Sequence, residues 1–140
     1  MRLTLDQLAG HIRSGARTFI IGNGGSYANA QHLCNDILLC GYPAFTLDPA
    51  TLTAFANDFG YDEVYRRWLA VVATPGDLLI ALSGSGRSPN IVAACNEARR
   101  MDLFIHLETY YLQDHDMQQS EELQVTLAHN LMRALRAAHR

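Results

Sequence analysis

The chain has 140 residues, of which 49% are hydrophobic and 18% charged, and its formal net charge is −3. This composition fits one globular domain with a substantial core, and the charge gives no electrostatic case for binding nucleic acid. Three cysteines without paired spacing favour a reducing compartment over a disulfide framework or a zinc ribbon. The polar N-terminus does not fit a signal peptide, and no apolar run approaches the roughly 18 residues of a membrane span. We therefore expect a cytoplasmic protein without a membrane or nucleic-acid partner.

Helical patterns alternate with short apolar runs along the whole chain. The first half predicts, in order, a short helix over residues 3–14, a strand over 17–21, a helix over 26–39, a strand over 43–47, a helical turn over 50–55, and a helix over 62–72 that begins at Asp62. The second half predicts a strand over 78–82, a helix from Pro89 to Met101, a strand over 103–107, a surface loop over 110–119, and a final helix from Ser120.

This alternation implies an α/β three-layer sandwich, in which a parallel sheet is flanked by helices and ligands bind at the carboxyl ends of its strands. We expect a single domain over residues 1–140, with a short N-terminal helical segment (1–16) before an α/β core and a C-terminal helix (17–140).

Two Gly- and Ser-rich loops each follow a predicted strand and lead into a predicted helix: Gly22-Asn-Gly-Gly-Ser26 and Ser83-Gly-Ser-Gly-Arg-Ser88. Free backbone N–H groups and the dipole at a helix start favour an anion there. Neither loop has the spacing of a Walker loop or a dinucleotide fingerprint, so a phosphorylated small molecule is the better prediction. The alternatives are a tight turn capped by Ser26 and a flexible Ser/Gly turn. The candidate ligand-binding residues are Asn23, Gly24, Gly25, Ser26, Ser83, Gly84, Ser85 and Ser88.

A second constellation combines His32 and Asp36, four residues apart on one helix face, with the final helix. The pair can bind a metal, act as acid and base, or form a hydrogen bond. On the final helix, Glu122 shares a face with His129, whereas Glu121 is rotated away by about 80°. His129 has apolar neighbours, which also fits a partly buried structural residue. Together His32, Asp36, His129 and one Glu would form an N/O site suited to zinc or a similar ion.

Several motifs resemble the sugar isomerase (SIS) domain over about residues 17–138, and within that family the phosphoheptose isomerases. They are the two loops, with the second extended through Pro89-Asn90, together with Ala56-Asn-Asp-Phe-Gly60 and Ala30-Gln-His32. The resemblance implies a flavodoxin-like fold and conversion of sedoheptulose 7-phosphate to D-glycero-D-manno-heptose 7-phosphate through an enediol(ate), a step toward lipopolysaccharide precursors. One alternative is a non-catalytic SIS module that binds a phosphosugar or a protein, as in the DnaA-initiator-associating protein. Another is an isomerase of a different phosphosugar.

The same resemblance assigns roles to particular residues. It implies that Ser83, Ser85 and Ser88 hold the phosphate, and that residues 23–26 with Asn57 and Asp58 bind the sugar. Asp36 would be the carbon base and His129 the complementary acid/base. One zinc ion per subunit would be bound by His32, Asp36, Glu121 and His129.

The chain also departs from the pattern of the phosphoheptose isomerases. Asp36 and Glu121 stand where those proteins have Glu and Gln. The shorter Asp36 side chain displaces the base, and a displacement of about 1 Å can cost about 100-fold in rate. The N-terminal helix is shorter than the one that builds the family's usual tetramer. We expect a homo-oligomer, a dimer or tetramer, with active sites near subunit interfaces.

Overall fold

The computed structural model describes residues 1–109 and 116–137. Four parallel strands form one sheet in the order β2-β1-β3-β4, with bounds β1 (Thr18–Gly22), β2 (Ala44–Phe45), β3 (Leu78–Leu82) and β4 (Phe104–Glu108). Gly22 pairs with Leu82, which in turn pairs with Glu108. The carboxyl ends of β1, β3 and β4 therefore meet at one edge of the sheet.

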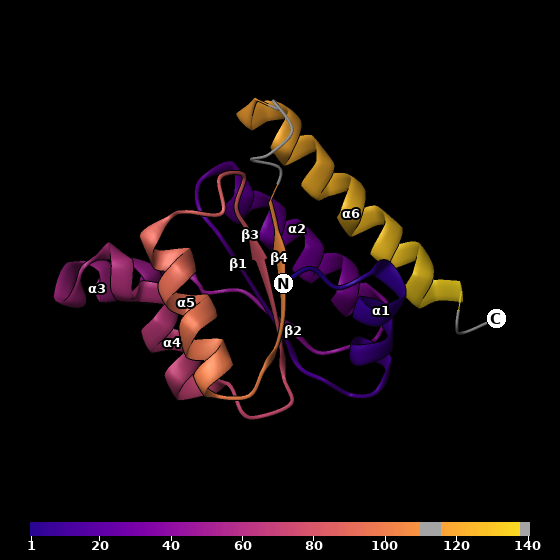
Figure 1. The fold of residues 1–140 in the computed structure, drawn as a ribbon, viewed down its shortest axis with the longest axis horizontal. Helices are drawn as coiled ribbons and strands as arrows, with labels where there is room; N and C mark the ends of the chain where they lie inside the picture. Colours follow the sequence, from indigo (N-terminus) through magenta and orange to yellow (C-terminus); the bar gives the residue numbers. More distant parts are fainter. Residues whose placement is uncertain (110–115, 138–140) are drawn as a thin grey trace.

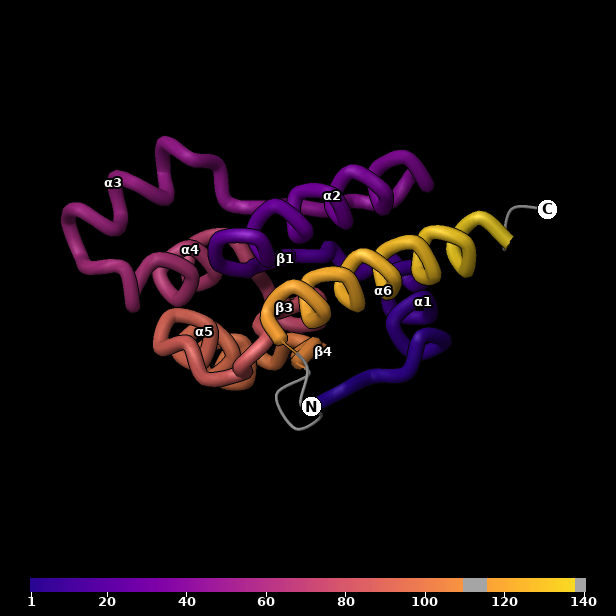
Figure 2. The backbone as a smooth tube through the Cα atoms, turned by 90° about the horizontal axis from the view of Figure 1, so that it is seen from above, coloured from indigo at the N-terminus to yellow at the C-terminus, as the bar shows by residue number. Residues whose placement is uncertain are grey.

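Helices cover both faces of the sheet, which confirms the predicted α/β architecture (Figure 1). One side carries α1 (Leu5–Arg13), α2 (Gly25–Leu39) and α6 (Met117–Ala137), and the other carries α3 (Pro49–Phe59), the 3₁₀ turn η1 (Tyr61–Glu63), α4 (Val64–Val72) and α5 (Pro89–Arg100). From above, α6 runs alongside α2 (Figure 2). No helix among the described residues combines the length and hydrophobicity needed to cross a bilayer.

The two central strands are apolar throughout because both of their faces are buried. Every residue of β1 and β3 is buried. Ile20 and Ile80 point into a cluster with α1, α2 and α6, whereas Phe19 and Leu79 point into a second cluster with α4 and α5. These two cores hold the sheet and fix the positions of the loops at its carboxyl edge.

The N-terminal segment covers the edge strand β4. Leu107 N–H donates to the Met1 carbonyl (3.0 Å), and Leu3 N–H donates to His106 Nδ1 (3.0 Å). Because Nδ1 accepts a backbone N–H, the ring proton of neutral His106 lies on Nε2, which donates to Glu108 at 2.5 Å. Arg2 pairs with the same carboxylate at 2.8 Å. These contacts use the polar groups of an otherwise open sheet edge.

Two predicted segments differ from the structure between β2 and α4. The expected turn over 50–55 is part of a full helix, α3, because the Asp48 side chain accepts the Thr51 N–H (3.0 Å) and Pro49 opens the first turn. Asp62 does not cap the following helix, because it lies within the turn η1. The strand predicted over 43–47 is only two residues long.

The last helix begins earlier than predicted. It starts at Met117 instead of Ser120, because Asp116 and Gln119 form reciprocal hydrogen bonds of 2.8 and 3.1 Å between side chains and backbone N–H groups. The loop predicted over 110–119 is therefore wrong at its C-terminal end. Its residues 110–115 lie outside the described residues.

Candidate functional site

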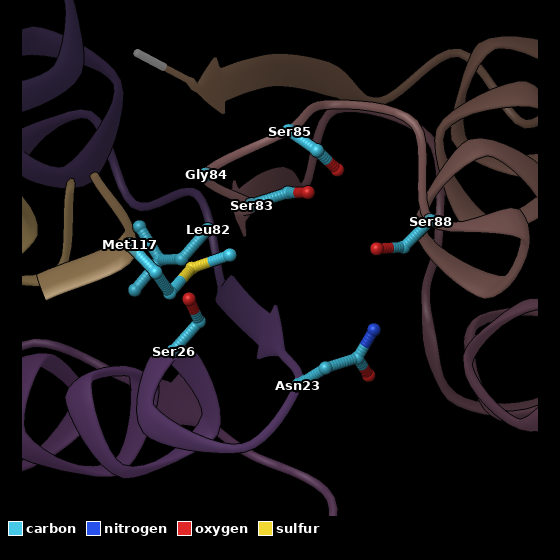
Figure 3. A pocket seen from close by; sticks show the side chains of 8 residues that line it. All are labelled: Asn23, Ser26, Leu82, Ser83, Gly84, Ser85, Ser88 and Met117. Carbon is cyan, nitrogen blue, oxygen red and sulfur yellow. The ribbon is translucent and has the colours of Figure 1, made fainter. Parts of the chain in front are cut away.

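A small cavity of about 70 Å³ lies between the two Gly/Ser loops at the carboxyl edge of the sheet. One water needs about 10–15 Å³ on this measure, so the cavity has room for a tetrahedral anion. Figure 3 shows the Ser83, Ser85 and Ser88 hydroxyls and the Asn23 side chain around a common opening. The lining residues are Asn23, Ser26, Leu82, Ser83, Gly84, Ser85, Ser88 and Met117. None of these side chains carries a charge, so neutral donors and helix ends would hold an anion there.

Both helix starts beside the cavity lack a side-chain cap. Gly24 is the N-cap of α2 and Ser88 the N-cap of α5, and neither side chain caps the helix. The alternative in which Ser26 only caps α2 does not hold, because Ser26 lies inside the first turn. Some first-turn N–H groups are already used, because Pro89 has none, the Ile91 N–H donates to Asn90 Oδ1 at 3.0 Å and the Ser26 N–H donates to the Asn23 carbonyl at 3.0 Å. The dipoles of α2 and α5 both favour negative charge at the cavity.

The hydroxyl groups of Ser83 and Ser85 in the second loop are oriented so that each can donate a hydrogen bond to a ligand. Ser83 Oγ accepts the Gly86 N–H at 3.0 Å, and Ser85 Oγ accepts the Arg87 N–H at 3.1 Å. Each bond occupies a lone pair of the hydroxyl oxygen and leaves its proton for another acceptor. The loop therefore presents O–H donors to the cavity, which suits phosphate oxygens.

Asn23 is held by two residues, Asn90 and Tyr61, to which the sequence analysis assigned no role in the site. Its side chain and that of Asn90 form reciprocal amide hydrogen bonds of 2.9 and 2.8 Å, and the Tyr61 hydroxyl donates to Asn23 Oδ1 at 2.8 Å. Since Oδ1 receives two donors, the remaining Nδ2 proton is the group that Asn23 offers to a ligand. Asn90 lies just after the second loop in the sequence. Its partner Asn23 is 67 positions away, so no pattern among neighbouring residues indicates that the two side chains pair.

The end of β1 is fixed by another residue without a sequence signal. The buried Tyr65 hydroxyl donates to the Gly22 carbonyl. Burial, with a further contribution from Tyr61, raises the pKa of Tyr65, so the hydroxyl stays protonated and remains a donor. This bond anchors the first loop where it leaves the strand.

The first loop requires glycine at positions 22 and 24, and a Cβ on Gly22 would lie 2.6 Å from the Ser26 backbone. Gly24 has φ of +56°, in a region that side-chain-bearing residues rarely adopt. A Cβ on Gly25 would collide with the carboxylate of Glu121. Glu121 therefore packs against the start of α2, where its charge complements the helix dipole.

His32, Asp36 and His129 gather on the facing sides of α2 and α6. His32 Nε2 lies 3.0 Å from His129 Nε2 and 3.3 Å from Asp36 Oδ2, and one ligand atom from each residue lies within 4.8 Å of the others. The Asp36 side chain is only 7% exposed, and its Oδ2 has no hydrogen-bond partner among the described residues. This buried carboxylate oxygen has a histidine beside it but accepts no hydrogen bond from the described residues, so it can still bind a metal ion.

These three residues form a possible metal-binding group. Ligand atoms of a tetrahedral zinc site, with bonds of about 2.0–2.2 Å, lie about 3.3–3.5 Å apart, close to the observed spacings. Two imidazole nitrogens and one carboxylate oxygen are also a donor set that suits zinc. The donor set and the bare Asp36 Oδ2 therefore fit the ion that the sequence predicted.

Five predicted site residues lie apart from these two groups, including Gly24 and Gly25, which do not line the cavity. Glu121 is not in the His32–Asp36–His129 group, and neither is Glu122. Asn57 and Asp58 do not line the cavity; they are exposed at the end of α3, where Asn57 donates to Asp58 at 3.1 Å. Cys34, by contrast, is buried in the core.

The comparison with protein families matches the SIS domain model to residues 2–105. The chain belongs to the SIS domain family. Among curated proteins, this SIS domain is 44% identical to a phosphoheptose isomerase of a Bradyrhizobium species over 100 residues, which are 66% of this chain and 50% of the relative. A phosphoheptose isomerase of Chlorobaculum parvum is 42% identical over 106 residues, 69% of this chain and 51% of the relative. The SIS domain thus spans about half the length of these curated relatives.

Solved structures show the same fold. A phosphoheptose isomerase from Neisseria gonorrhoeae superposes with a TM-score of 0.86 at 23% identity, over 95% of this chain and 83% of that one. The corresponding enzyme from Francisella tularensis gives 0.83 at 24% identity, over 95% and 84% of the two chains. The parallel sheet flanked by helices is therefore the SIS fold.

Proposed function

We propose that this SIS domain interconverts sedoheptulose 7-phosphate and D-glycero-D-manno-heptose 7-phosphate through an enediol(ate). The observation that carries the proposal is the bare, buried carboxylate of Asp36, which lies beside two histidines on the helix that begins at the donor-lined cavity. The similarity to proteins named phosphoheptose isomerase supports the same reaction. The product would feed lipopolysaccharide precursor synthesis in the cytoplasm.

The spacing along α2 suits a long phosphosugar. His32 and Asp36 lie six and ten residues beyond Ser26, which corresponds to about 9 and 15 Å of helix rise. Their side chains tilt back toward the helix start and the cavity. A phosphate held between the two loops would leave the opposite end of a seven-carbon chain near these residues, whereas a triose phosphate is too short.

The proposed chemistry moves one proton between neighbouring carbons. Asp36 would take a proton from C1 of the ketose, giving an enediolate, and return it to C2. His129 would transfer the proton between the two oxygens, so that the C2 carbonyl becomes a hydroxyl and the C1 hydroxyl becomes an aldehyde. The proton on Asp36 can exchange with solvent through the exposed His32 side of the cluster, and the serines would hold the phosphate end during the transfer.

We propose zinc as the cofactor, one ion per subunit, held by His32, Asp36 and His129. When bound, the ion would supply Lewis-acid polarisation of a carbonyl oxygen. Glu121 remains a candidate fourth ligand from the sequence, although its carboxylate packs against Gly25 in this structure. Asn57 and Asp58 likewise remain candidate sugar contacts.

We further propose that the chain forms a homo-oligomer with the site near a subunit interface. The support is apolar surface next to Asp36: Leu38 and Leu39, at the end of α2, are 52% and 66% exposed. The His32 side chain is 46% exposed, so the cluster reaches the same surface. Light scattering should give a dimer or tetramer, and an active monomer would contradict this point.

The function is tested by incubating the purified protein with sedoheptulose 7-phosphate and following the aldoheptose phosphate by NMR. Unphosphorylated sedoheptulose and a triose phosphate serve as controls, and neither should be converted at a comparable rate. Binding of sedoheptulose 7-phosphate without turnover would instead identify a phosphosugar-binding module. Turnover of a different phosphosugar alone would retain the isomerase chemistry and reject the heptose.

A further inference from the structure

Gln124 of α6 is a buried residue, 1% exposed, that connects the last helix to the cavity. Its Nε2 donates to Ser26 Oγ at 3.0 Å, and its Oε1 accepts from Asn29 Nδ2 at 2.9 Å. Asn29 Nδ2 also donates to the Glu121 backbone carbonyl at 3.0 Å. A chain of polar groups thus runs from the α6 backbone through α2 and ends at a serine that lines the cavity.

The backbone carbonyl sets the direction of every bond in this chain. Because a carbonyl oxygen can only accept, the Asn29 atom facing Glu121 is its NH₂ group. The same group faces Gln124, so the Gln124 atom there is the carbonyl oxygen. The Gln124 NH₂ group must then face Ser26 and donate to it. The amide of Gln124 cannot reverse without placing its NH₂ group against the NH₂ group of Asn29.

The direction of the last bond determines which way the Ser26 hydroxyl points. Ser26 is 4% exposed, and its oxygen receives the Gln124 N–H. Among the described residues, no acceptor takes the Ser26 proton. Figure 3 shows the Ser26 side chain at the cavity, across from the serines of the second loop. The proton is therefore free to be donated into the cavity.

We propose that Gln124 is a positioning residue that orients the Ser26 O–H toward a phosphate oxygen of the substrate. The inference rests on the proposed function, because it assigns the cavity to the phosphate group. Gln124 itself does not line the cavity, so it acts through Ser26. A residue that only joined α2 to α6 would affect stability but not the contribution of Ser26 to binding.

The sharpest variant is Gln124→Glu, which keeps the shape and the oxygen facing Asn29 but replaces the donor with an acceptor. Ser26 would then donate to the new carboxylate and turn a lone pair toward the phosphate. We expect the Kd for sedoheptulose 7-phosphate, measured by calorimetry at about pH 8.5 so that a buried Glu is ionised, to rise about tenfold or more. Gln118→Glu makes the same charge change at an exposed position of α6 and should leave the Kd nearly unchanged.

A double-mutant cycle separates orientation from charge repulsion. In a Ser26→Ala background there is no hydroxyl to turn, so Gln124→Glu should retain only the smaller, direct effect of the added charge. If Gln124→Glu does not fold, Gln124→Met supplies the same cycle with a smaller expected loss, about twofold to fivefold, that vanishes in the Ser26→Ala background. Circular dichroism confirms folding of each variant.

Each outcome decides between the two proposals. A loss that depends on Ser26 supports the inference, and an equal loss with and without Ser26, or no loss, overturns it. If the wild-type chain ignores sedoheptulose 7-phosphate but binds inorganic phosphate, the heptose proposal fails and the cycle is run with phosphate. If neither probe binds, both proposals fail.

Discussion

At the amino edge of the sheet, the carboxylate of Asp77 receives Arg17 at 2.6 and 3.2 Å and the Thr74 N–H at 2.8 Å. On α2, about 15 Å of helix rise beyond the cavity at the carboxyl edge, the equally buried carboxylate of Asp36 has a neighbouring histidine but no hydrogen bond to Oδ2 among the described residues. The hydrogen bonds of the first arrangement join the residues just before β1 and β3 and the turn at Thr74. In the second arrangement, Oδ2 of the Asp36 carboxylate accepts no hydrogen bond from the described residues, so this buried oxygen can still bind a ligand.

The contrast separates polar groups that stabilise the fold from those kept for a ligand. A buried carboxylate without donors costs stability, so its presence indicates a function outside the fold. The serine hydroxyls, which accept backbone N–H groups and leave their protons free, follow the same pattern. The Asp77 and Asp36 carboxylates should therefore respond in opposite ways to the same substitution.

The largest expected effect is on turnover in Asp36→Asn. Removing the carbon base should lower kcat about 10²- to 10⁴-fold, while thermal stability stays equal or rises because an uncompensated charge is lost. Steady-state assays with sedoheptulose 7-phosphate and a melting curve measure both. Asp77→Asn is the matched control and should keep its kcat. Wild-type turnover in Asp36→Asn would remove Asp36 from the mechanism.

The second-largest effect is expected on the zinc content of the His32→Ala variant. The wild-type chain is expected to carry about one zinc per subunit, and the variant should lose most of it because only two of the three clustered ligands remain. Elemental analysis after dialysis gives the ratio. His11→Ala, on α1 outside the cluster, is the control and should retain the metal. Full isomerase activity in metal-free protein would contradict the proposed cofactor.

Ser83→Ala should mainly weaken substrate binding. Loss of one hydrogen bond to a charged phosphate is worth about 1.5–3 kcal/mol, so KM should rise about tenfold or more with a smaller change in kcat. Ser14→Ala removes an exposed serine at the end of α1 and serves as the control. An unchanged KM in Ser83→Ala would show that the phosphate binds elsewhere.

Asp77→Asn should lower stability with little effect on catalysis. Burial alone would raise the pKa of Asp77, but hydrogen bonds from Arg17 and Thr74 outweigh it and hold the pKa below its usual value. The resulting stabilisation is present above the unfolded pKa of about 3.9 and is lost as the pH falls through the lower folded value. We expect a loss of about 1–2 kcal/mol at neutral pH, since Arg17 is partly exposed.

Urea unfolding at about pH 7 and pH 3 measures this difference, which should shrink at the lower pH. The exposed Asp62→Asn is the control and should have a much smaller effect at either pH. A Asp77→Asn variant with wild-type stability at neutral pH would show that the amino-edge contacts do not stabilise the fold.

Local patterns predicted most of the fold and both loops. The apolar runs of β1 and β3, the Gly and Ser residues that follow them, and the Ser88-Pro89 helix start are all readable from neighbouring residues. Helix periodicity also placed His32 and Asp36 on one face, where the structure has them.

The supporting contacts could not be predicted because they join distant segments. Asn23 meets Asn90, and Ser26 meets Gln124, only once the sheet brings their elements together. The packing of Glu121 against Gly25 depends in the same way on how α6 lies along α2. The division into residues 1–16 and 17–140 as parts of a single domain stays a prediction.

Hydrogen exchange at the reacting carbons tests the central claim most directly. Sedoheptulose 7-phosphate is incubated in D₂O with wild-type protein, Asp36→Asn or Asp77→Asn, and NMR follows both the aldoheptose phosphate and deuterium at C1 and C2. We predict conversion with deuterium incorporation in the wild type and Asp77→Asn, and neither in folded Asp36→Asn. Conversion or exchange at the wild-type rate in Asp36→Asn, or none in any of the three proteins, would contradict the assignment of Asp36 as the base of an isomerase site.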